Sequence, residues 1–290
     1  MTLIEMVEHA SAKLESAGVA YGHGTTNAFD EAAWLVLWRL GLPLDELDEN
    51  ADRVLSDTET EQVRTLVAQR ISTRKPAAYL TGEAWLQGVA FTVDERVIVP
   101  RSLIAEPLAD GTLDAWLSDR TRRVLDLCTG NGSLAVLAAL AWPEVQVRAT
   151  DISADALAVA TLNVQRHGLQ DRITLALGDG LAAAPGTYEL ILCNPPYVNR
   201  DSMNLLPPEF RAEPAIALDG NVHGGTDGMD FVRDLLRNVA RRLNDEGVLV
   251  LEVGNERANF EKAFPRLLPV WLPTSAGDDQ VLLLTREQLA

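Results

Sequence analysis

From about residue 100 onward, short apolar runs alternate with stretches of helix-forming residues. This alternation predicts a mainly parallel sheet that is covered by helices on both faces. Ligands of such sheets bind beyond the carboxyl ends of the strands. The chemistry of this chain is therefore expected in the residues that directly follow each strand.

The first part of the chain follows a different pattern. Residues 1 to about 85 carry amphipathic helical periodicity, with capping signals at Asn27 and at the Ser56/Glu59 pair. Alternating residues at 84–99, with Gly88 near the turn, then predict a hairpin. We therefore expect a helical domain at 1–83, a hairpin linker at 84–99 and an α/β domain at 100–290. Trp34 and Trp38 are interpreted as core residues, and the helical domain as a unit that recognises a protein substrate.

The apolar run at 188–193 predicts a buried strand, and Asn194-Pro195-Pro196-Tyr197 follows it directly. Two consecutive prolines cannot continue a strand, so the backbone must leave the sheet as a stiff turn. The Asn194 amide and the Pro195 carbonyl then lie beside the Tyr197 ring. Two fixed acceptors next to an aromatic ring form a place to hold a planar NH2 group. In isolation, the same four residues would favour an ordinary Pro-Pro turn with Asn194 as a turn residue.

A glycine loop lies further upstream. Residues 122–127 read as a strand that contains Asp126, and Thr129, Gly130 and Gly132 precede a helix-forming run at 134–140. A strand, a glycine loop and a helix open a nucleotide-binding βαβ unit. Ala135 stands where the dinucleotide pattern has its third glycine, and no Gly-Lys-Ser/Thr follows, so the loop need not cradle a pyrophosphate. An ordinary loop remains the alternative.

Two acids follow the next two predicted strands. Asp151 comes roughly 20 positions after Gly132, the separation at which an acid meets ribose hydroxyls in such folds. It could instead cap the helix at 153–166, where Ser153 competes for that role. Asp179 follows the strand at 173–177, where it could accept from an adenine amino group or serve as a turn residue. Four such strand ends in sequence are less expected by chance than any one alone.

Together these residues resemble the class I S-adenosylmethionine-dependent methyltransferases, and more narrowly the HemK/Prm group of glutamine N5-methyltransferases. The resemblance covers nearly the whole chain and includes the segments 225–228 and 247–252. The four-residue motif at Asn194 is shared with methyltransferases of exocyclic amines in DNA and RNA, whereas the segments 75–82 and 97–102 narrow the resemblance. The sequence at 102–106 differs from the release-factor branch and is similar to the branch that methylates a glutamine of large-subunit ribosomal protein three.

The resemblance implies a Rossmann-like, mainly parallel seven-stranded sheet, with an antiparallel last strand at 280–284. It implies S-adenosylmethionine as cofactor, with the glycine loop over the methionine part, Asp151 at the ribose and Asp179 near the adenine. The acceptor amide is expected at Asn194, Pro195 and Tyr197. The full set of cofactor-binding residues predicted in this way is Asp126, Thr129, Gly130, Gly132, Asp151, Asp179 and Asn194.

The charge composition of the chain limits the classes of macromolecule that it is expected to bind. The chain has 42 acidic and 25 basic residues and a formal net charge of −17, which opposes the basic footprint of a nucleic-acid binder. The charge favours a positively charged partner, such as a free ribosomal protein, although an acidic surface often serves solubility alone. The alternatives are a release-factor glutamine methyltransferase, an N6-adenine-type nucleic-acid methyltransferase, and an inactive binding module. Nucleic acid is not needed for the expected site, and the oligomeric state is left open.

The remaining features predict a cytoplasmic protein. No long uncharged apolar stretch suits a membrane span, and the N-terminus does not resemble a signal peptide. Cys128 and Cys193 lack metal-ligand spacing and should be reduced, buried and close to the cofactor, at the ends of neighbouring strands. No metal is expected. His23, His167 and His223 are interpreted as loop or helix-end residues with surface or capping roles, so no titrating base is expected.

Overall fold

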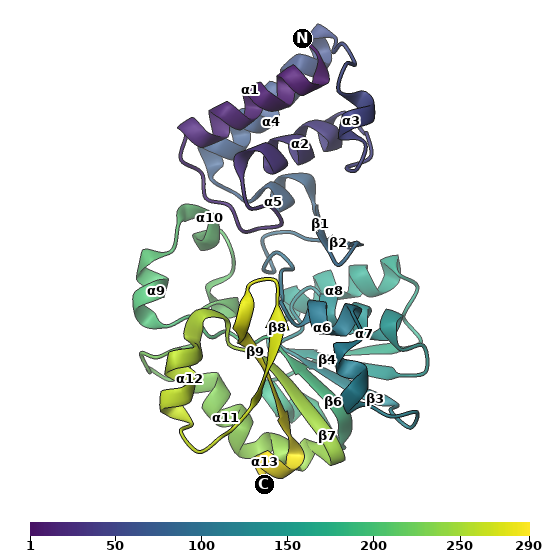
Figure 1. Cartoon of the computed structure of the whole chain (residues 1–290), viewed down its shortest axis with the longest axis vertical. Helices are drawn as coiled ribbons and strands as arrows, with labels where there is room; N and C mark the ends of the chain where they lie inside the picture. Colours follow the sequence, from purple (N-terminus) through teal and green to yellow (C-terminus); the bar gives the residue numbers. More distant parts are fainter.

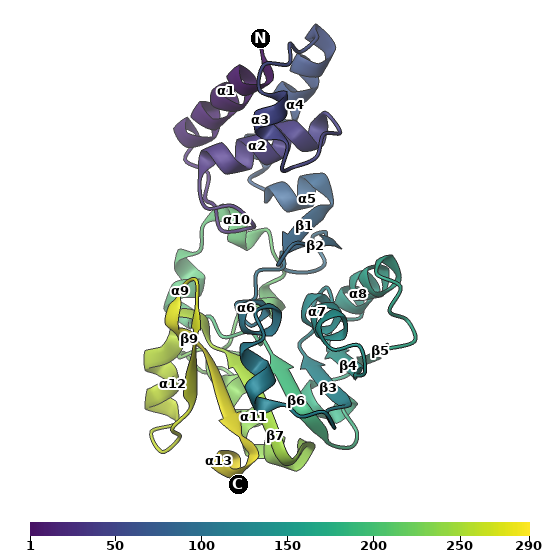
Figure 2. The same cartoon turned by 45° about the vertical axis from the view of Figure 1, so that its right-hand side comes forward.

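The computed structural model describes residues 1–290 and consists of two parts (Figure 1). A helical N-terminal part lies at one end of the long axis, and a larger α/β part with the C-terminus lies at the other. A small hairpin lies between them, and the segment with α9 and α10 reaches from the larger part towards the helical one (Figure 2). No helix is both long enough and apolar enough to cross a membrane.

The N-terminal part is helical, as its periodicity predicted. Thr2 and Ser56 each form a capping box at the start of a helix, and Asn27 caps the helix between them. The apolar face of the first helix is fully buried against the others. The helices are α1 (Leu3–Ser16), α2 (Ala28–Arg39), α3 (Leu47–Asn50), α4 (Asp57–Thr73) and α5 (Ala77–Thr81).

The hairpin is shorter than the sequence predicted. Strands β1 (Glu83–Leu86) and β2 (Val89–Thr92) are joined at Gln87 and Gly88, which both have positive φ as a tight two-residue turn requires. Residues 93–99 form no strand, because Asp94 accepts from the Arg96 backbone N–H and turns the chain. The hairpin packs on α8 (Ala154–Arg166), where buried Asn163 bonds both the N–H and the carbonyl of Thr92.

The larger part contains the predicted sheet of seven strands, in the order β5-β4-β3-β6-β7-β9-β8. Strands β5, β4, β3, β6 and β7 are parallel to one another. Strand β9 runs antiparallel to β7, which confirms the expected antiparallel last strand. The bounds are β3 (Arg123–Leu127), β4 (Gln146–Asp151), β5 (Ile173–Leu177), β6 (Tyr188–Cys193), β7 (Leu243–Glu252), β8 (Val270–Thr274) and β9 (Gly277–Thr285).

Helices cover both faces of this sheet, so it has two buried cores. Val124 of β3 packs into one core and Leu125 into the other, as the alternation along a strand requires. One face carries α6 (Ala105–Ala109), α7 (Ser133–Ala141) and α8, and the opposite face carries α11 (Asp230–Asn238), α12 (Arg257–Ala263) and α13 (Arg286–Leu289). The strand order reverses between β3 and β6, and crevices at such reversals bind ligands.

The segment after β6 carries α9 (Arg200–Leu205) and α10 (Pro208–Arg211) and joins the two parts through buried carboxylates. Glu209 accepts from Arg74 Nε at 2.5 Å and from Arg70 Nη1 at 3.3 Å. The Arg70 side chain is itself fully buried and donates to Glu31 at 2.8 Å. This network ties α2 and α4 of the helical part to α10 of the α/β part.

A second buried carboxylate lies four residues further on. Glu213 accepts two hydrogen bonds from Arg101, at 2.6 and 2.7 Å, and one from the Val99 N–H at 2.9 Å. His23 Nε2 lies 3.4 Å from Glu213, and the His23 ring packs against Phe210. The prediction of a surface position for His23 is therefore wrong, since only 1% of the residue is exposed. The loop that carries it is covered by α10.

Candidate active site

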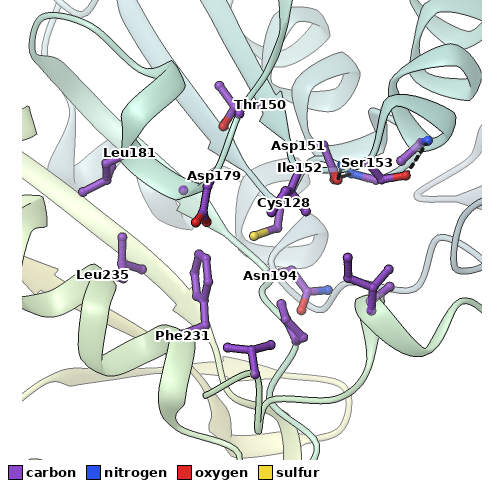
Figure 3. A pocket seen from close by; sticks show the side chains of 18 of the residues that line it. Cys128, Thr150, Asp151, Ile152, Ser153, Asp179, Leu181, Asn194, Phe231 and Leu235 are labelled. Carbon is purple, nitrogen blue, oxygen red and sulfur yellow. Dashed lines mark hydrogen bonds between the residues drawn. The ribbon is translucent and has the colours of Figure 1, made fainter. Parts of the chain in front are cut away.

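The carboxyl ends of four parallel strands surround a cavity of about 840 Å³. Its wall contains Cys128 and Gly130 after β3, Asp151 at the end of β4, Asp179 after β5 and Asn194 after β6. Figure 3 shows the side chains of Cys128, Asp151, Asp179 and Asn194 around one space. Leu181, Leu235 and Phe231 lie near Asp179, and Asn194 lies on the opposite side. The strand ends selected from the sequence are thus brought together.

Asp126 holds the glycine loop, residues 128–132, through its buried carboxylate. Its carboxylate is fully buried and accepts from Thr129 Oγ1 at 2.5 Å and from the Ala135 N–H at 3.1 Å, while its Oδ1 has no partner. Burial raises the pKa of Asp126 to about 7, against the opposing effect of these two bonds. Asp126 and Thr129 therefore hold the loop in shape and lie outside the cavity wall.

The two loop glycines serve different purposes. Gly130 has a φ of +55°, and a Cβ at this position would have nothing within 4 Å, so its backbone faces open space in the cavity. Gly132 has a φ of +82°, and a Cβ there would lie 3.2 Å from the Ala160 Cβ of α8. Gly132 thus permits close helix packing and lies outside the wall.

Asp151 fastens the loop from the other side. Its Oδ2 accepts from the Gly130 N–H at 2.9 Å, and its Oδ1 accepts from the Ser153 N–H at 2.9 Å. Ser153, and not Asp151, caps α8, which excludes the interpretation of Asp151 as the helix cap. Burial raises the pKa of Asp151, although the backbone N–H groups oppose this effect. The carboxylate lies in the wall with lone pairs left to accept further hydrogen bonds.

Asp179 stands at the apolar end of the cavity. It follows β5 and shares the wall with Leu181 of the turn Gly180–Ala183 and with Phe231 and Leu235 of α11. Figure 3 shows the Asp179 carboxylate directed towards the Phe231 ring. An acceptor beside flat apolar surfaces suits a planar heterocycle that carries an amino group.

Asn194 and Pro196 lie in the wall, whereas the buried Pro195 and the half-buried Tyr197 do not. The Tyr197 hydroxyl donates to Glu252 Oε1 at 3.0 Å, at the end of β7. A Cβ at Gly254 would lie 2.5 Å from Tyr197 Cε2, so the ring packs directly on this glycine. In this arrangement Tyr197 anchors the turn, and its ring lies outside the cavity wall.

Sequence reasoning missed Phe231, Leu235 and Glu252. The two apolar residues lie on α11, whose position over the cavity depends on the tertiary fold. Glu252 carried a usable signal, because it ends an apolar strand expected beside the strand that precedes Asn194. An acid at the carboxyl end of a buried parallel strand is a site candidate on the same grounds as Asp151 and Asp179.

The cysteines are both free, and their strands are neighbours, as predicted. Cys128 has a φ of +57°, lies in the cavity wall and is half-buried, where the sequence predicted a buried residue. Cys193 is fully buried and lies outside the wall. Its pKa is raised well above the usual value by burial and by the neighbouring Cys128.

The sequence resembles known proteins along its whole length. Residues 5–82 match the family model described as the PrmC N-terminal domain, and residues 111–207 match the methyltransferase small domain. A protein named ribosomal protein uL3 glutamine methyltransferase from Bordetella pertussis is 54% identical and covers 99% of this chain and 96% of its own length. The chain belongs to the family of ribosomal protein uL3 glutamine methyltransferases.

Two further relatives with the same name support this assignment. The protein from Burkholderia pseudomallei is 50% identical over 99% of this chain and 95% of its own length. The protein from Neisseria meningitidis serogroup A is 47% identical over 99% of this chain and 94% of its own length. Among solved structures, the hMettl16 catalytic domain in complex with the MAT2A 3'UTR hairpin 6 has a TM-score of 0.52 at 14% identity. It covers 79% of this chain and 81% of that one, and this likeness concerns the fold alone.

Proposed function

We propose that this protein transfers a methyl group from S-adenosylmethionine to the side-chain amide nitrogen of a glutamine in free ribosomal protein uL3. The observation that carries this proposal is the position of Asn194, in the wall of the same cavity as Gly130, Asp151 and Asp179. The names of the relatives support the assignment of uL3 as the acceptor protein and of glutamine as the modified residue. The reaction takes place in the cytoplasm, where ribosomal proteins are made.

The residues of the cavity fit the cofactor. Gly130 leaves room at its Cβ position for the methionine part, the free lone pairs of Asp151 suit ribose hydroxyls, and Asp179 beside Phe231 suits an adenine amino group. When bound, S-adenosylmethionine supplies an electrophilic methyl group on a sulfonium. Asp126, Thr129 and Gly132 contribute by shaping the loop, without contacting the cofactor themselves.

The acceptor nitrogen needs orientation because an amide nitrogen is a poor nucleophile. Its lone pair is delocalised into the carbonyl, by the resonance that also flattens a peptide bond. In the proposed arrangement, Asn194 Oδ1 and the Pro195 carbonyl each accept one N–H of the glutamine amide. The nitrogen is then held with its lone pair directed into the cavity. Alignment and exclusion of water supply most of the rate enhancement.

No side chain needs to act as a general base in this scheme. Once it carries the methyl group, the amide nitrogen is strongly acidic and loses its extra proton to water. Two of the histidines lie outside the cavity wall: His23 is buried against Glu213, and His167 is bonded to the Ala90 carbonyl. His223 lies in the cavity wall, with its exposed side chain 2.8 Å from Asp234.

The charge of the protein favours a basic partner in its free form. A net charge of −17 attracts a basic ribosomal protein and repels exposed ribosomal RNA. The helical residues 1–83 supply further contacts to the protein substrate. Methylation is therefore placed before uL3 is packed into the large subunit, where the glutamine would no longer reach Asn194.

A competition between acceptors tests this proposal. The enzyme and labelled cofactor are offered free uL3, mature large subunits, a peptide-release factor and RNA in equal amounts. We expect free uL3 to take most of the label. Preference for the release factor would shift the assignment to that branch, labelled RNA would favour the nucleic-acid alternative, and efficient labelling of mature subunits would overturn the timing.

A further inference from the structure

The turn that carries Asn194 is held at both of its ends. Cys193 pairs with Leu251 in the sheet, so Asn194, directly after β6, and Glu252, the last residue of β7, lie at the ends of neighbouring strands. Three residues later, the Tyr197 hydroxyl donates to Glu252 Oε1 at 3.0 Å. Between these two fixed points, Pro195 and Pro196 each restrict φ to about −65°. The direction of the Pro195 carbonyl therefore depends on where Tyr197 is anchored.

The anchor is itself immobilised by a third segment of the chain. The second oxygen of Glu252 accepts from Ser102 Oγ at 2.6 Å and from the Leu103 N–H at 3.0 Å. Glu252 is 3% exposed and Ser102 is 6% exposed, so water does not compete for these bonds. Burial raises the pKa of Glu252, and the hydrogen bonds from Ser102, Tyr197 and Leu103 oppose this effect.

A second carboxylate repeats this arrangement one turn further along. Glu256 accepts from Asn199 Nδ2 at 2.7 Å and from the Asn199 N–H at 3.3 Å. Gly254, between the two acids, leaves the space that the Tyr197 ring occupies. The segment after β7 thus holds the chain after Asn194 at two successive points.

We propose that Glu252 is a positioning residue for methyl transfer, which acts through the Tyr197 hydroxyl to orient the Asn194 side chain and the Pro195 carbonyl. The inference rests on the proposed function, because it assigns the two acceptors of the glutamine amide to this turn. Tyr197 then acts as an anchor and not as a surface for the amide. Ser102 and Leu103 fix the carboxylate, which explains why the segment after Pro100 lies under the site.

A double-mutant cycle tests the coupling. Tyr197→Phe removes only the hydroxyl, and Glu252→Gln keeps the size of the side chain while removing its charge. We expect each variant to lower kcat for uL3 methylation by about tenfold, the value of a hydrogen bond to a charged group, with KM and cofactor Kd little changed. The double variant should be no slower than the slower single variant. Tyr188→Phe is the matched control, since this buried tyrosine donates to the Pro185 carbonyl far from the cavity.

Hydrogen exchange gives a second readout that does not need an acceptor. The backbone amides of Asn194 and of residues 197–199 should exchange faster in Tyr197→Phe and Glu252→Gln than in the wild type, and at the wild-type rate in Tyr188→Phe. Independent, multiplicative losses of kcat, or an unchanged kcat in an active enzyme, would overturn the inference. Failure of the wild type to methylate uL3 would contradict the proposed function. Unchanged hydrogen exchange in both variants would separately show that Glu252 and Tyr197 do not anchor the turn.

Discussion

The buried carboxylate of Glu213 should account for a large share of the stability that joins the two parts of the protein. Its side chain is fully buried, and Arg101 binds it with two hydrogen bonds. Burial alone would raise the pKa of Glu213, but the charge and hydrogen bonds of Arg101, with His23 nearby, lower it from 4.5 to about 2. At about 1.4 kcal/mol per pH unit, this difference corresponds to about 3 kcal/mol of stability at neutral pH.

The sign of the pH dependence follows from the lowered pKa. The contribution is fully present above the unfolded-state pKa near 4.5 and is lost as the pH falls through the folded-state value of about 2. Glu213→Gln should therefore lower the free energy of unfolding by about 3 kcal/mol near pH 7, in the range found for breaking a buried ion pair. The gap between wild type and variant should shrink by about 1.4 kcal/mol on reaching roughly pH 3.5.

Urea unfolding followed by tryptophan fluorescence, at several pH values, measures this gap. Glu246→Gln serves as the control, because Glu246 is exposed and makes no hydrogen bond or ion pair, and its effect should stay within about 0.5 kcal/mol. The reasoning would be refuted by a loss below about 1 kcal/mol at neutral pH. A gap that stays constant down to roughly pH 3.5 would refute it equally.

Other consequences can be tested at the site itself. Asn194→Ala should abolish most methyl transfer while calorimetry still detects cofactor binding, because only an acceptor for the glutamine amide is removed. Asp151→Ala should weaken cofactor binding at least about tenfold, since the Gly130 N–H also loses its partner; unchanged affinity would contradict the assigned contact. Bound cofactor should slow the alkylation of Cys128, which lies in the cavity wall, and equal labelling rates would count against this placement. The initial rate of uL3 methylation at low substrate should fall as salt is added, because the attraction is long-range; a flat salt profile would argue against electrostatic encounter.

Local patterns were sufficient to predict the main helices of the N-terminal part and the strands that precede the site. Asn27 and Ser56 signal helix starts through their own side chains, and the Pro-Pro pair after Cys193 ends a strand whatever surrounds it. The residues after parallel strands must meet at one edge of the sheet, which explains why Gly130, Asp151 and Asn194 were identified together.

Contacts between distant segments could not be predicted in this way. The pairs of Glu209 with Arg74 and of Glu213 with Arg101 join residues more than a hundred positions apart in the sequence. The residues adjacent to them in the sequence give no sign of a buried ionic partner. The same packing of α10 buries His23, against the prediction. Tyr197 shows that a motif can name the right residue without specifying the direction of its side chain.

The central claim is tested most directly by locating the methyl group. Free uL3 is incubated with the enzyme and S-adenosylmethionine, digested, and fragmented in a mass spectrometer, beside a parallel reaction with Asn194→Ala. The account predicts one methyl group on the side-chain amide of a glutamine with the wild type and almost none with the variant. A methyl group on a lysine, an arginine or the protein terminus, or equal modification by Asn194→Ala, would contradict it.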